Sequence, residues 1–187
     1  MQFHSLHDVL IEQVQDLYSA EQQLVEALPK VANAAGSDEL RQTIENHLEE
    51  TRGHLERLQE LLPTLGAGAP TEQCEGMAGL LREGDKVIAA TGDPAAKDAA
   101  LIAAAQRVEH YEIAGYGSAV TFAKLLGDNE AARMLAQTLN EEELADKKLT
   151  EIAERTINVQ AARGGDDEEA SGSRSNGRKR TASARSR

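Results

Sequence analysis

Two glutamates interrupt apolar stripes whose residues recur at the spacing of an α-helix. With about 100° per residue, one stripe lines a single helical face, and Glu21 occupies a step near its centre. Glu112 occupies the corresponding step of another stripe. A lone carboxylate inside a helical core costs several kcal/mol or must take up a proton. Acids that meet from different helices are better explained by a shared cation, and carboxylate oxygens with an imidazole nitrogen suit iron or manganese.

Two further stripes add acids and an imidazole to this pattern. One stripe is interrupted at Glu142 and Asp146. The other has Thr51 in its middle, and Glu50 and His54 lie along its edge, four residues apart and therefore on one helical face. Because four helices can direct such side chains into one bundle core, the sequence predicts a site for two metal ions that share carboxylates.

Taken singly, these residues have ordinary explanations. A single glutamate on an apolar stripe usually pairs with Lys or Arg or extends to solvent. The runs Glu49–Glu50 and Glu141–Glu143 are typical of solvated faces, His47 and His54 are typical of partly exposed polar positions, and His110 lies off its stripe. The coincidence of central acids at equivalent places in different stripes favours the metal site over these explanations.

Helix-terminating residues divide the chain into four long helices and one short helix. Predicted ends lie at Gly36, Pro63, Gly92–Pro94 and Gly127–Asp128, and Pro29 predicts a kink inside the first helix. The predicted helices cover residues 5–35, 37–62, 71–90, 94–126 and 129–159. A long crossover that carries the short helix joins the second long helix to the third, which is the connectivity of a ferritin-like four-helix bundle.

The long helices are predicted to form two similar hairpins. The offset between Glu21 and Glu112 also superposes leucines of the second helix on leucines of the fourth. The repeat is approximate, because the same offset pairs Glu50 with Glu141. The tyrosines beside the candidate acids are interpreted as packing or hydrogen-bonding groups rather than as redox partners, and they are Tyr18, Tyr111 and Tyr116.

Composition excludes several classes of protein. A chain of 187 residues fits one domain and a tail, and 3% aromatic residues disfavour an all-β core. The net charge is −12 for the whole chain and −14 for residues 1–163, and so acidic a body disfavours a general nucleic-acid platform. Cys74 is the single cysteine, so a disulfide framework and a cysteine-rich metal module are excluded. The sequence has no signal-peptide pattern or long apolar run, so a cytoplasmic protein without membrane contact is expected.

The composition changes after residue 163. Residues 164–187 contain no aliphatic side chain larger than Ala, so they are predicted to be a disordered tail next to a bundle domain of residues 1–163. Six basic residues fall within 174–187. They favour either a solubilising end or a weak electrostatic contact with nucleic acid.

Four segments carry a family resemblance that covers about residues 5–160. They closely resemble the YciE/YciF branch of the ferritin-like superfamily, and they read DLYSAEQQL (16–24), HLEETRGHLERL (47–58), AALIAAAQRVEHYEIAGYGSA (99–119) and TLNEEELADKKLTEIA (138–153). The resemblance implies a rubrerythrin-like centre with two metal ions, a homodimer and a role in bacterial stress responses. It also implies a set of carboxylate ligands: Glu21, Glu50, Glu112 and Glu142, with Glu109 as a further one.

The sequence departs from the ferritin and rubrerythrin pattern at the histidine ligand. Those families place Glu-x-x-His on a helix, but Gly53 stands three residues after Glu50. His54 is one step late and His47 precedes Glu50 by three residues, so either histidine or neither supplies the imidazole. The absence of a rubredoxin-type cysteine module and of a fifth helix after residue 159 disfavours a self-contained peroxide reductase and a storage cage.

These observations lead to one main functional hypothesis and two alternatives. The main hypothesis is a stress-response protein with two iron ions, or iron and manganese, that meets peroxide or oxygen, with a di-iron oxidase or peroxide-scavenging activity as the possible enzyme. The first alternative is a non-catalytic structural or interaction bundle whose acids pair with Lys or Arg. The second alternative is a nucleoid-associated ferritin-like protein that uses its basic tail.

Overall fold

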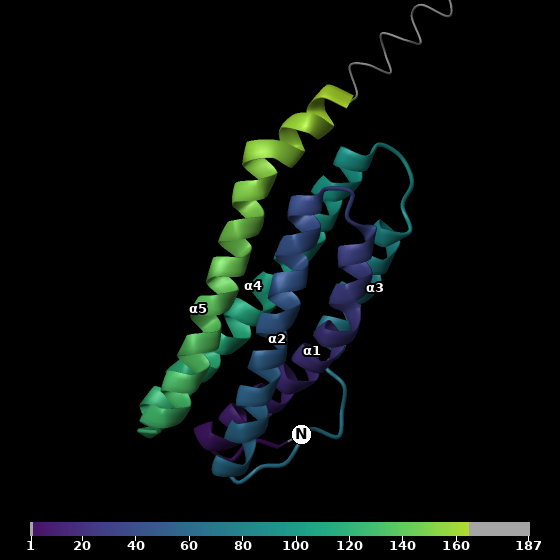
Figure 1. The fold of residues 1–187 in the computed structure, drawn as a ribbon. Helices are drawn as coiled ribbons and strands as arrows, with labels where there is room; N and C mark the ends of the chain where they lie inside the picture. The colour runs from purple at the N-terminus through teal and green to yellow at the C-terminus, as the bar shows by residue number, and fades with distance from the viewer. Residues whose placement is uncertain (1, 165–187) are drawn as a thin grey trace, which may run out of the picture.

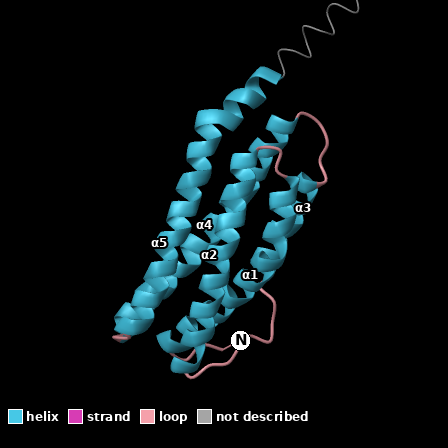
Figure 2. Cartoon of the chain, in the orientation of Figure 1, coloured by secondary structure: helices cyan, strands magenta, loops and turns pink. Residues whose placement is uncertain are grey.

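The computed structural model describes residues 2–164, and every regular element among them is helical (Figure 1 and Figure 2). The five α-helices are α1 (Leu6–Ala34), α2 (Asp38–Thr64), α3 (Glu75–Ile88), α4 (Pro94–Leu126) and α5 (Asn129–Ile152). A π-helical segment, Ala153–Ile157, follows α5 directly, and helix resumes over residues 158–164. Apart from its first residue, the predicted tail over 164–187 lies outside the described residues, so its disorder stays a prediction.

The long helices form two hairpins that pack against each other. Helix α1 pairs with α2 and α4 pairs with α5, while contacts of α1 with α4 and of α2 with α5 close the bundle. A crossover of residues 65–93 joins α2 to α4 and carries α3. Helix α3 packs on α1 and α4, on the side of the bundle away from α5 (Figure 1). The prediction of an all-α bundle with a short helix in its crossover is confirmed.

Capping residues explain most helix boundaries. Ser5 forms a capping box at the start of α1, and Asp93 caps α4 ahead of Pro94. Helix α4 ends at Gly127, whose φ of 78° is left-handed and therefore suits glycine. These boundaries match the predicted ones. Pro29 lies inside α1, which continues beyond it.

Three boundaries differ from the prediction. Helix α3 begins at Glu75 rather than near residue 71, because Cys74 is its N-cap and accepts a backbone hydrogen bond through Sγ. Helix α2 continues one residue past Pro63. The last helix is α-helical only to Ile152, where the π-helical segment begins. Neither a sulfur cap nor a π-helical turn has a strong signature in sequence spacing.

Buried apolar side chains form two clusters, one towards each end of the bundle. The first cluster contains, among others, Leu24, Leu28, Leu40, Ile44, Met77, Leu101, Val108 and Leu149. The second cluster contains, among others, Leu10, Val14, Leu17, Leu58, Leu61, Tyr116, Ala119 and Leu135. On every long helix, a short stretch of sequence separates the residues of one cluster from those of the other. The candidate metal ligands on α2, α4 and α5 fall in these stretches, and Glu21 on α1 directly follows Ala20 of the first cluster.

Helices α1 and α4 approach each other closely beside this central level. A Cβ atom at Gly115 would lie 2.9 Å from Leu17 Cδ2, which is closer than side chains normally pack. A Cβ atom at Gly117, two residues further along α4, would meet no atom within 4 Å. Glycine at position 115 therefore permits the α1–α4 contact that brings Glu21 and Glu112 to the same level.

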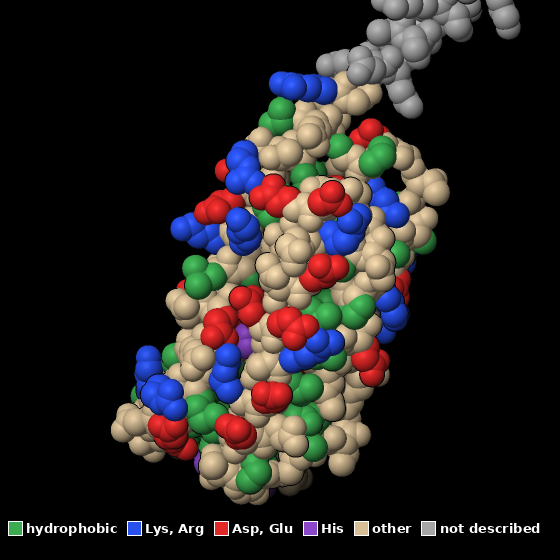
Figure 3. Space-filling model, in the orientation of Figure 1, with side chains coloured by type: hydrophobic (Ala, Val, Ile, Leu, Met, Phe, Trp, Pro, Cys, Tyr) green, Lys and Arg blue, Asp and Glu red, His purple; other side chains and the backbone are tan. Residues whose placement is uncertain are grey.

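One face of the described surface carries charged side chains of both signs. On the face shown in Figure 3, acidic and basic side chains are interspersed rather than gathered into separate patches. A basic stripe of the kind that tracks phosphates is not seen on that face. Within residues 2–164, no helix is both long enough and apolar enough to cross a lipid bilayer.

Candidate metal centre

A layer of buried polar side chains crosses the bundle between its two apolar clusters. All four long helices contribute to it, and each of its members is at most 7% exposed. The layer comprises Glu21 on α1, His47, Thr51 and His54 on α2, Glu109 and Glu112 on α4, and Glu142 on α5. Burying so many ionisable groups at one level is costly unless opposite charges compensate them.

Helical spacing explains why these residues face inwards together. On α2, His47, Thr51 and His54 follow one another at four and three residues, which places them on one face. The hydroxyl of Thr51 donates to the backbone carbonyl of His47 at 2.9 Å. On α4, Glu109 and Glu112 are three residues apart and share the inner face in the same way.

Glu21, His54 and Glu142 form the first group of ligand atoms. His54 Nδ1 lies 2.9 Å from Glu142 Oε1 and 3.3 Å from Glu21 Oε1. Ligand atoms held about 2.1 Å from one ion lie about 3–4 Å from one another, so these separations suit a common cation. The hydroxyl of Tyr116 donates to Glu21 Oε1 at 2.6 Å and fixes that carboxylate.

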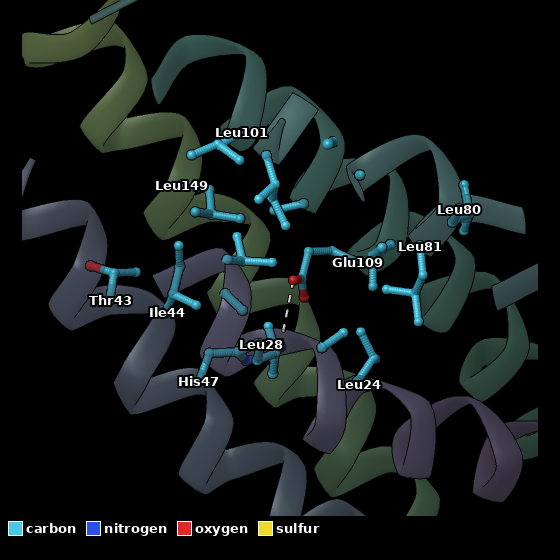
Figure 4. Close-up of a pocket in the computed structure, with 18 residues that line it drawn as sticks. Leu24, Leu28, Thr43, Ile44, His47, Leu80, Leu81, Leu101, Glu109 and Leu149 are labelled. Carbon is cyan, nitrogen blue, oxygen red and sulfur yellow. Dashed lines mark ion pairs between the residues drawn. The ribbon is translucent and has the colours of Figure 1, made fainter. Parts of the chain in front are cut away.

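His47, Glu109 and Glu142 form the second group. His47 Nε2 lies 3.5 Å from Glu109 Oε1 and 3.8 Å from Glu142 Oε2. Figure 4 shows the His47 and Glu109 side chains directed towards each other from α2 and α4. In each group, the ligand atoms lie within 4.8 Å of one another and all three residues are buried.

Glu142 belongs to both groups through different oxygens. Its Oε1 faces His54, and its Oε2 faces His47. A carboxylate that offers one oxygen to each of two neighbouring ligand groups has the arrangement that bridges two metal ions in ferritin-like centres. The geometry therefore suits a pair of cations, with Glu142 between them.

Each histidine directs its second nitrogen to a carboxylate outside the layer. His54 Nε2 lies 3.0 Å from Glu141 Oε2, and His47 Nδ1 lies 3.4 Å from Glu50 Oε2. The guanidinium of Arg57 holds Glu141 at 2.5 Å. Histidines that bind metals commonly donate their other N–H to a carboxylate, which fixes the ring orientation and leaves the inner nitrogen free to coordinate. Both rings have this arrangement.

The charges of the layer shift its pKa values strongly. Burial lowers the pKa of His54, but Glu142 and Glu21 outweigh it and raise this pKa to about 10. Burial also lowers the pKa of His47, but Glu109, Glu50 and Glu142 raise it to about 9. Without a metal, both imidazoles therefore carry a proton at neutral pH and partly compensate the acids.

The carboxyl groups respond in different ways. Burial raises the pKa of Glu109 to about 8 despite the nearby His47. Burial and the charges of Glu21, Glu142 and Glu109 raise the pKa of Glu112 well above its ordinary value. Burial would raise the pKa of Glu142 as well, but the neighbouring rings of His54 and His47, which are positively charged when protonated, hold it below the ordinary value.

Several buried atoms of the layer have no hydrogen-bond partner among the described residues. These atoms are Glu21 Oε2, His47 Nε2, His54 Nδ1, Glu109 Oε2, both carboxylate oxygens of Glu112 and both of Glu142. Within residues 2–164, the ion pairs of these four glutamates involve only His47 and His54, and none involves Lys or Arg. Four carboxylates would balance the charge of two divalent cations, so oxygen-binding metal ions fit this site.

The structure brings together most of the residues that the sequence singled out. Glu21, His54, Glu109 and Glu142 belong to the two groups, and Glu112 is buried at the same level without belonging to either. The expectation of a partly exposed His54 is wrong, since its side chain is fully buried. The same expectation for His47 is wrong as well, because it lies buried in the second group.

Two of the predicted ligands lie apart from the groups. The Glu50 side chain is 52% exposed and contacts only the outer nitrogen of His47. Asp146 accepts a hydrogen bond from Gln106 at 2.9 Å and lies 3.5 Å from His110 near the surface. Both acids lie on the helices that carry ligands, but their side chains extend away from the buried layer.

Sequence reasoning missed the register of α2. Thr51 stands at the central step of the stripe, and His54 follows it by three residues, which is the spacing that the Glu-x-x-His pattern requires. The search for a histidine started instead from Glu50, one residue too early. The spacing of His47, Thr51 and His54 was the available signal, because the buried face is centred on Thr51 and carries both histidines, whereas Glu50 lies about 100° from Thr51 around the helix.

Comparisons with known proteins identify relatives that match most of this chain. Residues 5–162 match the family described as a domain of unknown function, DUF892. The chain is 43% identical to the protein YciF of Escherichia coli (strain K12) over 162 residues, which covers 86% of this chain and 98% of YciF. The crystal structure of the E. coli stress protein YciF superposes with a TM-score of 0.80 and covers 83% of this chain and 99% of that one.

Two further structures place the fold more broadly. YcfI from Rhodopseudomonas palustris is 39% identical, with a TM-score of 0.75, and covers 79% of this chain and 94% of its own. A dodecameric thioferritin from Bacteroides fragilis, related to bacterioferritin, has a TM-score of 0.62 at 17% identity and covers 86% of this chain and 90% of its own, a likeness of fold alone. The match over most of its length, together with the likeness to YciF, shows that the chain belongs to the DUF892 family and is close to YciF.

Proposed function

We propose that the chain is a stress-response protein whose bundle holds two divalent metal ions, either two iron ions or iron with manganese. The observation that carries the proposal is the position of Glu142 between two buried ligand groups, one on each of its oxygens. Oxygen ligands with one imidazole in each group favour iron or manganese over softer metals. The relation to the E. coli stress protein YciF supports the cellular role.

Bound as Fe(II), such a pair supplies electrons to peroxide or dioxygen. The protein's own residues bind the two ions, orient the ligand atoms and shield the site from bulk water. Glu21 and His54 hold one position, Glu109 and His47 hold the other, and Glu142 spans both. Glu112 contributes two buried oxygens at the same level. The apolar clusters on both sides exclude bulk water, which strengthens the interaction of carboxylates with cations.

Metal quantification tests this proposal. The full chain, purified with iron or manganese present, is expected to bind two ions per chain. Glu142→Gln should lose both ions, because it weakens both groups, and Glu21→Ala or Glu112→Ala should reduce the content. Glu143→Gln is the matched control, since Glu143 is the exposed neighbour of Glu142 on α5. A metal content that stays the same in Glu142→Gln, or that is absent from the wild type, would overturn the proposal.

The alternative is a structural bundle whose candidate acids pair with Lys or Arg. Among the described residues, the ion pairs of the buried glutamates involve histidines and no Lys or Arg, which disfavours this alternative. The homodimer implied by the resemblance and the cytoplasmic location expected from the sequence remain part of the proposal. A weak nucleic-acid contact of the basic residues in 174–187, which lie outside the described residues, is tested by gel shift. Full-length protein and a chain ending at Arg163 are compared across a salt series, and a phosphate contact must weaken as salt rises.

A further inference from the structure

An apolar cavity lies directly beside the second ligand group (Figure 4). All five helices line it, and it leaves about 60 Å³ of space for the centre of a water-sized molecule. On a similar measure, a single water needs about 10–15 Å³. The polar residues of its lining are His47 and Glu109, which end the cavity at the metal-binding layer, and Thr43 on α2. The remaining side chains are leucines, isoleucines, valines and alanines.

The crossover helix forms the outer wall of this cavity. Leu80, Leu81, Gly84 and Ile88 of α3 line it opposite the residues of α1 and α4. Leu80 and Leu81 are only partly buried, and Figure 4 shows both on the side of α3. The apolar face of α3 therefore covers a space that leads to His47 and Glu109 and also packs against the first apolar cluster.

A second opening, here called the polar opening because Asn46, Glu50 and Lys148 line it alongside the apolar Leu144 and Ala145, reaches the same histidine. It lies between α2 and α5, and its lining includes Asn46, Glu50 and Lys148 together with His47. His47 therefore borders both spaces, with an apolar approach on one side and a polar approach on the other. A polar solute therefore finds hydrogen-bonding partners along the polar opening that most of the apolar cavity does not offer.

We propose that the apolar cavity binds small apolar molecules of the size of dioxygen and delivers them to the His47–Glu109 group. This inference rests on the proposed function, because it selects dioxygen as the oxidant that uses the cavity. Dioxygen is an apolar diatomic molecule and loses little hydration when it enters an aliphatic space. Hydrogen peroxide carries two O–H groups, which would go unpaired along most of this lining, so the polar opening suits it better.

Gly84 offers a way to fill the cavity without disturbing its walls. It lines the cavity, and a Cβ atom at this position would meet no atom within 4 Å. Gly84→Leu is therefore expected to place its side chain in the empty space and to favour the helix as well. Gly79→Leu is the matched control, because Gly79 lies on the same helix outside the cavity lining. Ala104→Leu fills the cavity from α4 and serves as a second blocking variant.

Xenon binding to the metal-free full-length protein is the first test, because it does not depend on any metal. Methyl resonances of Leu24, Leu28 and Leu101 are expected to shift saturably with xenon pressure in the wild type and in Gly79→Leu. Loss of these shifts is expected in Gly84→Leu and Ala104→Leu. Wild-type protein without saturable shifts, or blocking variants that bind xenon as the wild type does, would overturn the proposal.

Oxidation of Fe(II)-loaded protein is the second test. One dioxygen takes up two electrons, one from each of two Fe(II) ions, and two protons, and leaves as hydrogen peroxide. With dioxygen as the oxidant, Gly84→Leu is expected to slow oxidation by about tenfold, since the rate follows the fraction of molecules with an open cavity. With hydrogen peroxide, the rate is expected to match that of Gly79→Leu. Equal slowing with both oxidants would contradict a separate apolar route.

The two tests distinguish failure of this inference from failure of the proposed function. A protein that binds xenon but retains no metal refutes the proposed function, and with it the delivery of dioxygen to iron. A protein that binds two metal ions but shows no xenon site refutes only the apolar route.

Discussion

Glu142 Oε1 lies 2.9 Å from His54 Nδ1, yet the two atoms are not aligned for a hydrogen bond. The opposite nitrogen of the ring, Nε2, lies 3.0 Å from Glu141 Oε2 in a hydrogen bond. When a metal ion displaces the inner proton of this ring, Nε2 still donates outwards and the Nδ1 lone pair faces inwards, beside an oxygen that also has lone pairs to offer. Two such atoms are better satisfied by a shared cation than by each other.

The outer carboxylate on His54 gives the first prediction. Glu141→Gln should keep the bundle folded but weaken metal binding by about 10–100-fold, because a carboxylate on the outer nitrogen makes the imidazole a stronger ligand. Competition with a chelator of known affinity measures the change. The control variant is Glu143→Gln, at an exposed residue two positions further along α5, and it should bind metal as the wild type does. Equal affinities of the two variants would contradict the assigned role of Glu141.

The stability of the metal-free protein should fall as pH rises. His47 and His54 have folded pKa values of about 9 and about 10, above the ordinary 6.5, so their stabilisation is complete below about pH 6.5. It is lost as pH rises through 9 and 10. Glu109, with a pKa raised from 4.5 to about 8, changes stability in the same direction, because the folded state holds its proton more tightly.

Urea unfolding in the presence of a chelator, at pH 6, 8 and 10, measures this dependence. With metal bound, the pH dependence should weaken or reverse, because the metal competes with protons for the same ligand atoms. A metal-free protein that is more stable at pH 10 than at pH 6 would contradict the assigned pKa values.

Glu112 should lower the free energy of unfolding of the metal-free protein, and it should contribute to metal binding when a metal is present. Both of its oxygens are buried without hydrogen-bond partners. Glu112→Met, of similar length, should therefore stabilise the metal-free protein by about 1–3 kcal/mol. The same change should reduce the stabilisation that excess metal gives the wild type, which is about 2.7 kcal/mol at a concentration of 100 times Kd. Unfolding curves with and without metal test both effects, and a destabilised metal-free variant would refute the first.

The close contact of α1 and α4 yields a paired prediction. Gly115→Ala should destabilise the protein by about 1–3 kcal/mol, because its Cβ would lie 2.9 Å from Leu17 Cδ2. Gly117→Ala, on the same helix with open space at its Cβ, should stabilise it by about 0.4–1 kcal/mol. Thermal unfolding of both variants tests the contrast. Similar effects of the two substitutions would mean that α1 relaxes away from α4 at no cost.

The fold followed from features that act locally. Ser5, Asp93 and Gly127 mark helix ends through their own capping geometry, and apolar stripes at helical spacing identify the buried faces. The start of α3 was harder to predict, because Cys74 caps it through sulfur, and cysteine is not among the usual N-cap residues. The π-helical segment at Ala153–Ile157 depends on packing that a single sequence does not reveal.

The site was predictable where a residue interrupts a stripe and was missed where the register had to be chosen. Glu21, Glu112 and Glu142 stand inside stripes, and all three are buried in the layer. Glu50 lies beside a stripe, and one residue of error corresponds to about 100° of rotation, which turns an inner side chain outwards. The two histidines were undervalued because a buried imidazole depends on acids from other helices, which are distant in sequence.

The two outer carboxylates differ in their exposure, since Glu50 is 52% exposed and Glu141 is 25% exposed and held by Arg57. The two ligand groups that these carboxylates support, one at His47 and one at His54, therefore differ in their exposure to solvent. We expect exchange to be sequential: the position at His47 would empty first under a chelator and fill last on reloading. A half-loaded form would then persist, and its lifetime would set how quickly the protein responds to a change in available metal.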